Sequence, residues 1–478
     1  MVKAGERSYH KLIIYLAIIA LFFLIIPPVG TISAEGMRLV GLFIAFVYGV
    51  TVTTDVWPSL LTWVFFPLTG VVTFKESLAL NFGSDVFFFV LLSLVLLAYM
   101  ETSGAAAFAA AWLLKRKFIV GHPWRLIFML MFVCWLISSF VNAIAGMMLT
   151  WVFMYEIFAK FNYKPYEKFP SLMMLGTCAF GGLGLSTLPW GNNSIVILDV
   201  LEKTADLKVN YMEYILYTVP YALFVLAGFM LLCRFVFKLD VTPLKDFNPA
   251  DLSQEVQKAT PEKIVALLAM LSLILLILIP SSLPQDSPVA VFMGNFGLSG
   301  KLIFIFTVLQ LIRINGKPAC SFVENAKKGV SWKLVMMVAI ILTFSPLIAG
   351  DNTGINETLG TVISPLFDNQ PALVFIILAA IVTVICTNFM INKIIAILMV
   401  SITLPIGVQL GIDPLQLGFL YTVICTVAFM LPSASQSATV LFSNTEWVRA
   451  KDVYKYGLPM IILMTVLQVA WNLIFFAI

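Results

Sequence analysis

Phe140-Val141-Asn142-Ala143-Ile144 and Met390-Ile391-Asn392-Lys393-Ile394 are the two stretches from which the fold can be deduced. Each places one asparagine inside an apolar run, and the two asparagines are 250 positions apart (142 to 392). This interval indicates a duplicated chain with paired polar breaks. Transporters built from repeats bind substrate where interrupted helices of the two halves meet near the bilayer centre. Asn142 and Asn392 are therefore the first candidates for substrate contact.

The composition is that of a membrane protein. Hydrophobic residues make up 61% of the 478 residues and charged residues 11%, whereas soluble proteins are about half apolar and about a quarter charged. Apolar runs long enough to span a bilayer recur along the chain, and no soluble domain fits between them. We therefore predict an all-α polytopic protein of the cell inner (plasma) membrane.

The sequence offers little material for cofactor or metal chemistry. The six cysteines are scattered, mostly within apolar runs, and none forms a pair at metal-ligand spacing. The only histidines, His10 and His122, lie in segments that flank spans, so a histidine metal site or hydrolytic triad is not expected. The net charge of +4 is explained by cytoplasmic loops. We expect no cofactor, no metal, no nucleic-acid partner and no enzymatic activity.

Lysine and arginine in short loops orient the spans, because cytoplasmic loops are enriched in both. Basic residues precede the first apolar run, which lacks a cleavage pattern, so we expect a retained first helix and a cytoplasmic N-terminus. Basic segments then alternate with segments that lack cations, such as 351–370 and 407–414. Threading the chain on this alternation predicts about eleven transmembrane helices and two opposed re-entrant hairpins.

The duplication extends beyond the hairpins. Glu101-Thr102-Ser103-Gly104 recurs at the same interval as Asp351-Asn352-Thr353-Gly354. An amphipathic helix is expected after each glycine, and Ala105–Lys117 is basic whereas Ile355–Phe367 carries Glu357 and no cation. The two halves should therefore be inserted upside down relative to each other, as inverted repeats. The predicted parts are an N-terminal helix (1–36), a first repeat (37–240), a cytoplasmic linker (241–262) and a second repeat (263–478).

Each half has a second break, in a helix that should otherwise span the membrane. The breaks are Ser186–Asn193, with Pro189, and Pro432–Ser437. A proline inside a helix removes a backbone donor and disrupts the turn. The helices that restart after the breaks, with the inner arms of the two hairpins, would direct four N-termini toward one site. Each N-terminus carries partial positive charge and free N–H groups, so the expected ligand is an anion.

With these elements the sequence resembles the divalent anion/sodium symporter (DASS) family of di- and tricarboxylate and sulfate transporters. The resemblance covers nearly the whole chain. Ala428–Pro432 followed by Ser435 resembles the family's lead into its second broken helix, and Gly181-Gly182 leading to Asn192 resembles the first. The resemblance implies substrate carboxylate at the hairpin tips, sodium in the surrounding loops, and a homodimer with scaffold contacts and moving substrate domains.

The chain departs from the family at the tips. Where the family has Ser-Asn-Thr, Val141 and Ala143 flank the first asparagine, and Ile391 and Lys393 flank the second. Both asparagines are kept while all four hydroxyls are lost. In the second broken helix, where the family has a Thr-Pro-Pro-Asn-like loop, this chain has Gln436-Ser437-Ala438 in place of Pro-Pro-Asn. The groups that the resemblance assigns to sodium coordination are missing, so sodium coupling is not expected.

Lys393 is the most informative single residue. A lysine deep in the bilayer costs about 2.5–3.5 kcal/mol and usually faces a cavity or a partner. A substrate carboxylate within about 4 Å would offset that cost by on the order of 4 kcal/mol at an effective dielectric of about 20. A fixed ammonium would then replace a bound sodium ion. The alternatives are snorkelling to the surface or an ion pair with one of Asp55, Asp85, Glu101 and Asp351.

The remaining site candidates are polar residues at the tips and breaks, each of which could instead satisfy backbone groups. An asparagine at a hairpin tip can cap the following helix, which is compatible with binding. Thr387 is a weaker candidate, and Glu101 and Asp351 are expected to cap or anchor the scaffold. The predicted substrate-binding residues are Asn142, Ala143, Asn392, Lys393, Thr187, Asn192, Asn193, Ser435, Gln436 and Ser437.

We predict a secondary active transporter of small organic anions, dicarboxylates in particular, that works by alternating access as a sodium-independent exchanger. Its partners would be the anionic substrate, the lipid bilayer and a second copy of the chain. Sodium- or proton-coupled symport of sulfate or di- and tricarboxylates is an alternative. A cation/proton antiporter would use Asp55, Asp85 and Glu101 as carriers but lacks a midplane carboxylate pair, and an embedded enzyme lacks a visible nucleophile, base or metal cluster.

Overall fold

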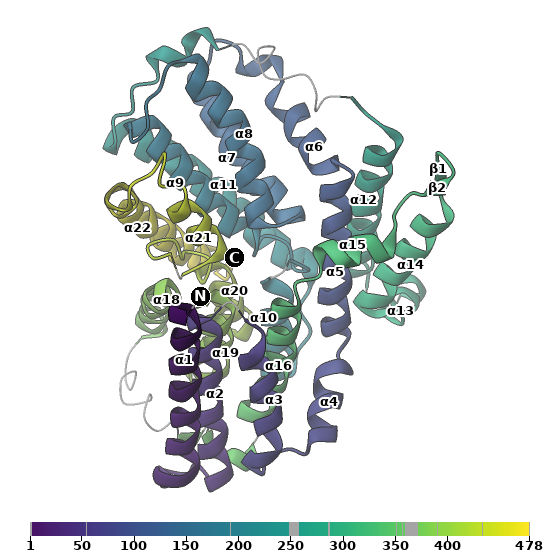
Figure 1. Ribbon diagram of the computed structural model, residues 1–478, viewed down its shortest axis with the longest axis vertical. Coiled ribbons are helices and arrows are strands. Elements are labelled where there is room, and N and C mark those ends of the chain that lie inside the picture. The colour runs from purple at the N-terminus through teal and green to yellow at the C-terminus, as the bar shows by residue number, and fades with distance from the viewer. Residues whose placement is uncertain are drawn as a thin grey trace.

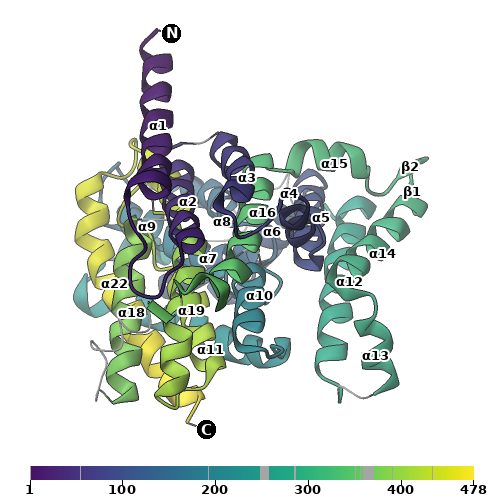
Figure 2. The same ribbon diagram turned by 90° about the horizontal axis from the view of Figure 1, so that it is seen from below.

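The structure, a computed structural model, is almost entirely helical (Figures 1 and 2). It describes residues 2–53, 55–191, 193–247, 258–284, 287–349, 351–355, 357–358, 371–389, 391–432 and 434–477. Among these residues the only strands are β1 (Arg313–Ile314) and β2 (Lys317–Pro318), which pair as a short antiparallel hairpin. The predicted all-α class is confirmed.

Nine described helices are long and apolar enough to cross a membrane, and there are up to eleven if two bent pairs are each counted as one span. The protein is therefore a multi-pass membrane protein. The bent pairs are α13 (Pro288–Gly294) with α14 (Gly297–Leu311), at 81°, and α15 (Phe322–Gly329) with α16 (Trp332–Ala349), at 79°. The nine are α2 (Ala34–Val52), α5 (Asp85–Thr102), α7 (Pro123–Phe140), α8 (Ala143–Lys160), α11 (Tyr211–Leu231) with its continuation η3 (Leu232–Val236), α12 (Pro261–Ser281), α18 (Ala372–Phe389), α19 (Asn392–Gln409) and α22 (Ala450–Phe475).

The N-terminal helix α1 (Val2–Ala20) continues into η1 (Leu21–Ile25) and packs along α2. In Figure 2 its first turns extend beyond the rest of the molecule. Both views place α12, α13 and α14 on one side of the molecule and α18 and α22 on the other (Figures 1 and 2). The chain thus forms a lateral group of helices and a separate group that contains the second hairpin.

Short helices of each half pack against long helices of the other half. Asn81 of α4 (Phe74–Phe82) accepts a hydrogen bond from Thr343 of α16. In the reciprocal contact, Asn325 of α15 accepts one from Thr102 of α5, at 2.8 Å. The preceding helices make matching contacts: α3 (Trp57–Thr69), before α4, packs against α16, and α14, before α15, packs against α5. Such reciprocal contacts are what a two-fold relation between duplicated halves would produce.

Each half contains a helical hairpin followed by a broken helix. The hairpins are α7 with α8 and α18 with α19. The first broken helix consists of α9 (Lys168–Gly184) and α10 (Ser194–Ala205), and the second of α20 (Pro414–Ile424) and α21 (Gln436–Ser443). Pro189 and Pro432 lie between the half-helices of the first and second broken helix. The second interval begins after Ile424, earlier than the predicted break at Pro432–Ser437, and Gln436 and Ser437 already belong to α21.

Glycines allow the first broken helix to pack tightly. A Cβ added to Gly184 would lie 2.6 Å from the Cβ of Ser138, and one added to Gly182 would lie 3.1 Å from the carbonyl oxygen of Thr426. Real Cβ atoms do not tolerate the first contact. The small residues at the end of α9 thus let it contact both the first hairpin and the turn of the second broken helix.

Three connecting segments differ from the prediction or lie outside the described residues. The expected amphipathic helix over Ala105–Lys117 is shorter in the structure, where α6 spans Ala105–Leu114. α6 carries no charged residue, and the basic residues follow it. The reason is local: the alanine-rich run favours helix, and the chain then turns toward α7, with the Arg116 guanidinium lying on the Trp112 ring at 3.3 Å. Of the expected helix over Ile355–Phe367, residues 356 and 359–367 are outside the described residues. The linker contains η4 (Thr242–Asp246), and its residues 248–257 are likewise outside them.

Candidate functional site

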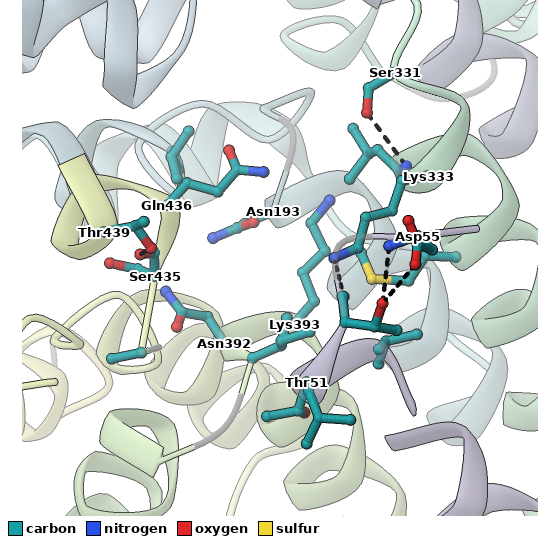
Figure 3. Close-up of a pocket in the computed structure, with 18 of the residues that line it drawn as sticks. Thr51, Asp55, Asn193, Ser331, Lys333, Asn392, Lys393, Ser435, Gln436 and Thr439 are labelled. Atoms are coloured by element: carbon teal, nitrogen blue, oxygen red, sulfur yellow. Dashed lines mark hydrogen bonds between the residues drawn. The ribbon is translucent and has the colours of Figure 1, made fainter. Parts of the chain in front are cut away.

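A cavity of about 530 Å³ lies between the tip of the second hairpin, the turns of both broken helices and the ends of α2 and α16 (Figure 3). Small-molecule sites in proteins usually measure about 300–1,000 Å³. The cavity is large enough for a small organic anion. Its polar lining residues are Lys11, Thr51, Thr53, Asp55, Asn193, Ser331, Lys333, Asn392, Lys393, Ser435, Gln436 and Thr439.

The tip of the second hairpin contributes Ile391, Asn392 and Lys393 to this lining. Ile391 is the N-cap of α19 and makes no side-chain cap, so Asn392 and Lys393 occupy the first turn of the helix. Both are buried, with exposed fractions of 6% and 4%. The Asn392 side-chain oxygen accepts a hydrogen bond from the Thr387 hydroxyl at 3.2 Å. Asn392 is therefore not a helix cap, and it lines the cavity beside Lys393.

The tip of the first hairpin has a different role. Asn142 caps α8, because its side-chain oxygen accepts a hydrogen bond from the Ala145 N–H at 2.8 Å. Its amide nitrogen donates to a carboxylate oxygen of Glu101, also at 2.8 Å. Asn142 and Ala143 do not line the described cavity. The structure therefore does not bring the two asparagines together at one site. For Asn142 it shows helix capping, which the sequence analysis considered as an alternative to substrate binding.

Asn193, in the first broken-helix turn, lines the cavity with its polar side chain. It precedes α10 without capping it, and it is 95% buried. Within the described part of the chain, its amide nitrogen has no hydrogen-bond partner. Figure 3 shows the Asn193 side chain between Lys393 on one side and Ser435 on the other, with its amide nitrogen toward Ser435. A buried donor without a partner is costly, so Asn193 is suited to a ligand that accepts a hydrogen bond. Asn192 lies outside the described residues.

The second broken-helix turn contributes Ser435 and Gln436. The Ser435 hydroxyl caps α21 by accepting from the Ala438 N–H at 3.1 Å, and it donates to the Ala428 carbonyl at 2.7 Å. Ser437 is buried behind it, at 2.9 Å between the two hydroxyls. Ser435 and Gln436 line the cavity, whereas Ser437 supports the turn.

Thr187 belongs to the scaffold of the first break. Its hydroxyl accepts from the Trp135 indole N–H at 2.8 Å and donates to the Leu183 carbonyl at 3.0 Å. It does not line the described cavity. Its contacts hold the turn in place.

Three of the four helix N-termini predicted for the site lie at the cavity, and the start of α16 lies there as well. The first residues of α19 and the N-cap residues of α10 and α21 belong to its lining. Each N-terminus adds partial positive charge. The fourth expected N-terminus, that of α8, is capped by Asn142 away from the lining. The cavity is thus electrostatically suited to an anion.

Two further lysines line the cavity that were not predicted from the sequence as site residues. The Lys11 ammonium of α1 donates to the Val52 carbonyl at 2.5 Å, and the Lys333 ammonium of α16 donates to the Thr53 carbonyl at 2.7 Å. Both carbonyls are at the C-terminal end of α2. In the sequence each of the two lysines lies near the start of an apolar run, where a lysine resembles an ordinary interfacial cation and does not indicate a binding site.

The acidic residues considered as partners of Lys393 are spread over the molecule. Asp85 accepts from the backbone N–H groups of Leu298 and Ser299, at 2.7 and 3.0 Å, and so caps α14. Glu101 is bonded to Asn142. Asp55 lines the cavity and accepts from the Thr53 hydroxyl at 3.1 Å. The side chain of Asp351 is outside the described part of the structure.

No group of three or more metal-ligating side chains occurs among the residues that the structure describes. The chemistry available in the cavity is therefore electrostatic and hydrogen-bonding. Ammonium groups, amides, hydroxyls and helix N-termini can bind carboxylates, and none of them is arranged for covalent catalysis.

Comparison with known proteins gives a consistent family. The model of the citrate transporter family CitMHS matches residues 42–424. Over 137 residues the chain is 26% identical to the Na(+)/dicarboxylate cotransporter 3 of Rattus norvegicus and 25% identical to that of Homo sapiens. These matches cover 29% of this chain and 22% of each relative, so the chain aligns with only about a fifth of the relatives' length.

Two solved structures share the fold. The YdaH transporter of Alcanivorax borkumensis superposes with a TM-score of 0.58 at 16% identity, over 92% of this chain and 97% of the other. MtrF of Neisseria gonorrhoeae, described as illuminating a class of antimetabolite efflux pumps, superposes with a TM-score of 0.55 at 12% identity, over 96% and 97%. Together with the family match, they confirm the predicted resemblance to DASS-like anion transporters.

Proposed function

The chain belongs to the CitMHS citrate transporter family, and from this premise we propose that it is a secondary active transporter of small dicarboxylates. Membership of a transporter family agrees with the sequence prediction that the chain is not an enzyme. The observation that carries the proposal is the cavity in which buried Lys393 and Asn193 meet three helix N-termini. The dicarboxylate named for the relatives is compatible with this cationic site.

We propose that transport is an exchange that does not need sodium. The four residues beside the tip asparagines are Val141, Ala143, Ile391 and Lys393, which offer no side-chain oxygen to a cation. In this proposal the Lys393 side chain supplies a positive charge that stays with the protein, in place of a bound ion. Because a fixed ammonium cannot leave with the substrate, the empty carrier keeps its charge and returns slowly unless another anion is loaded.

Alternating access would arise from two inverted repeats, 37–240 and 263–478, in a homodimer of the inner membrane with a cytoplasmic N-terminus. The reciprocal contacts Asn81–Thr343 and Asn325–Thr102 support this arrangement. In the proposed orientation the cavity faces the cytoplasm, because its exposed residues Asp55 and Ser331 follow cytoplasmic ends of helices. The first hairpin, whose tip residue Asn142 is hydrogen-bonded to Glu101, would open in the opposite state.

Counterflow in proteoliposomes tests the function directly. Vesicles containing the purified protein and loaded with unlabelled succinate, malate or citrate should accumulate the matching labelled anion, with sodium or with choline outside. Protein-free vesicles and vesicles loaded with chloride are the controls. Uptake that never exceeds these controls for any di- or tricarboxylate would refute the proposal.

A further inference from the structure

The part of the cavity wall formed by α1, α2 and α16 carries two cations that no role in the proposed transport has yet used. Lys11 and Lys333 come from different helices, yet each donates to a carbonyl in the last turn of α2 or just after it, Val52 or Thr53. Cations are favourable at helix C-termini, so one reading is that the two lysines only cap α2.

Capping the end of α2 uses only part of the hydrogen-bonding capacity of the two lysine ammonium groups. An ammonium has three donors, and each of these bonds to a carbonyl uses one. Lys11 and Lys333 both line the cavity that also contains Lys393, and Figure 3 shows the Lys333 and Lys393 side chains extending into the same space. Cations that line a cavity between apolar helices are usually kept for a function. The remaining donors can therefore bind a ligand.

The charge of the lining is also informative. Lys11, Lys333 and Lys393 contribute three positive charges, and Asp55 contributes one negative charge. Counted formally, with each lysine as +1 and Asp55 as −1, the lining has a net charge of 3 − 1 = +2. A ligand with two carboxylates would neutralise it, whereas a monoanion would leave an uncompensated cation.

We propose that Lys11 and Lys333 form a second carboxylate subsite, so that the substrate bridges the second hairpin tip and the α1–α2–α16 wall. One carboxylate is bound by Lys393 and Asn193, and the other by Lys11 and Lys333. The inference rests on the proposed function and specifies its substrate class: anions with two carboxylates on a short chain. A bridging dianion would neutralise the cations of both walls, which is consistent with the proposed exchange.

The test compares two anions of equal length. Succinate has two carboxylates, and succinamate has one carboxylate and one neutral amide. Equilibrium binding to the purified full-length protein should favour succinate by at least about tenfold. Lys333→Gln and Lys11→Gln should each reduce this ratio to about threefold or less, mainly by weakening succinate. Lys333→Arg keeps the charge and should keep most of the preference.

Lys328→Gln is the matched control, because Lys328 is an exposed lysine of the neighbouring helix α15 that does not line the cavity. It should leave both affinities unchanged. Thermal unfolding identifies any variant that fails to fold, and Lys11→Gln then decides in place of Lys333→Gln. If folded glutamine variants keep the wild-type ratio, the lysines only cap α2 and the inference is wrong. If the wild type binds neither anion nor citrate, it is the proposed function that fails.

Discussion

The side-chain oxygen of Asn388 accepts a hydrogen bond from the backbone N–H of Met430, at 3.0 Å. The same oxygen accepts from the Phe429 N–H at 3.2 Å, and the amide nitrogen donates to the Val427 carbonyl at 2.9 Å. Asn388 is near the end of α18, and the other residues belong to the turn between α20 and α21. One buried side chain thus fastens the second hairpin to the second broken helix, and the two should move as one body with Lys393.

We predict that Asn388→Ala destabilises the protein by about 1–3 kcal/mol, because it leaves buried backbone N–H groups without partners. The unfolding midpoint in detergent should fall by several degrees, and anion affinity should fall as well, since the turn that carries Ser435 loses its support. Asn295→Ala is the control: Asn295 is exposed at the end of α13 and is equally an asparagine. An Asn388→Ala protein as stable as the control would show that Thr387, which bonds the Cys425 carbonyl, is sufficient to hold the turn.

The sequence predicted the breaks because polar residues and prolines stand out in apolar runs. It could not distinguish the roles of Asn142 and Asn392, which occupy equivalent positions in the two halves. The difference is tertiary: Asn142 meets Glu101, whereas Asn392 meets Thr387 and the cavity. Similarly, Lys11 and Lys333 are far apart in sequence and look like interfacial cations. Only the packing of α1 and α16 on the end of α2 places both in one lining.

The inverted orientation of the halves leads to a labelling prediction. In a protein lacking Cys386, the only native cysteine that is not buried, Arg116→Cys should react only with a reagent applied from the cytoplasmic side. Glu357→Cys should react only from the opposite side, because its segment is the counterpart of the one after Gly104. Right-side-out and inside-out vesicles with a membrane-impermeant maleimide provide the measurement. Labelling of both positions from one side would contradict the inverted arrangement.

We predict that transport persists without sodium, because Val141, Ala143, Ile391 and Lys393 replace the hydroxyl residues expected at the tips. Initial rates of dicarboxylate exchange should be equal, within about twofold, in sodium and in choline. Varying sodium at fixed substrate is the measurement. A saturable and absolute sodium requirement would mean that backbone carbonyls alone coordinate the ion, and that the chain works like the sodium cotransporters to which it is similar.

Asn193 should matter for binding but not for stability. Its amide nitrogen donates no hydrogen bond within the described structure, so Asn193→Ala removes no intramolecular bond from that atom. We expect an unchanged unfolding midpoint and an anion affinity that is about 10- to 100-fold weaker, since a hydrogen bond to a charged group contributes about 1.5–3 kcal/mol. Ser194→Ala alters the adjacent residue, which does not line the cavity, and serves as the control. Normal affinity in Asn193→Ala would remove Asn193 from the site.

The final prediction concerns Lys393, which we expect to provide the main charge that holds the anion. Lys393→Gln should weaken anion binding at least about tenfold, which corresponds to about 1.4 kcal/mol, and leave the folded protein in detergent largely intact. Lys301→Gln, at another buried lysine that lies in α14 and outside the cavity lining, should leave binding unchanged. Lys393→Thr restores part of the family's tip and should introduce a measurable stimulation by sodium. If Lys393→Gln binds the anion normally but unfolds easily, the lysine is a structural ion-pair partner, and Asn193, Asn392 and the helix N-termini must hold the anion without it.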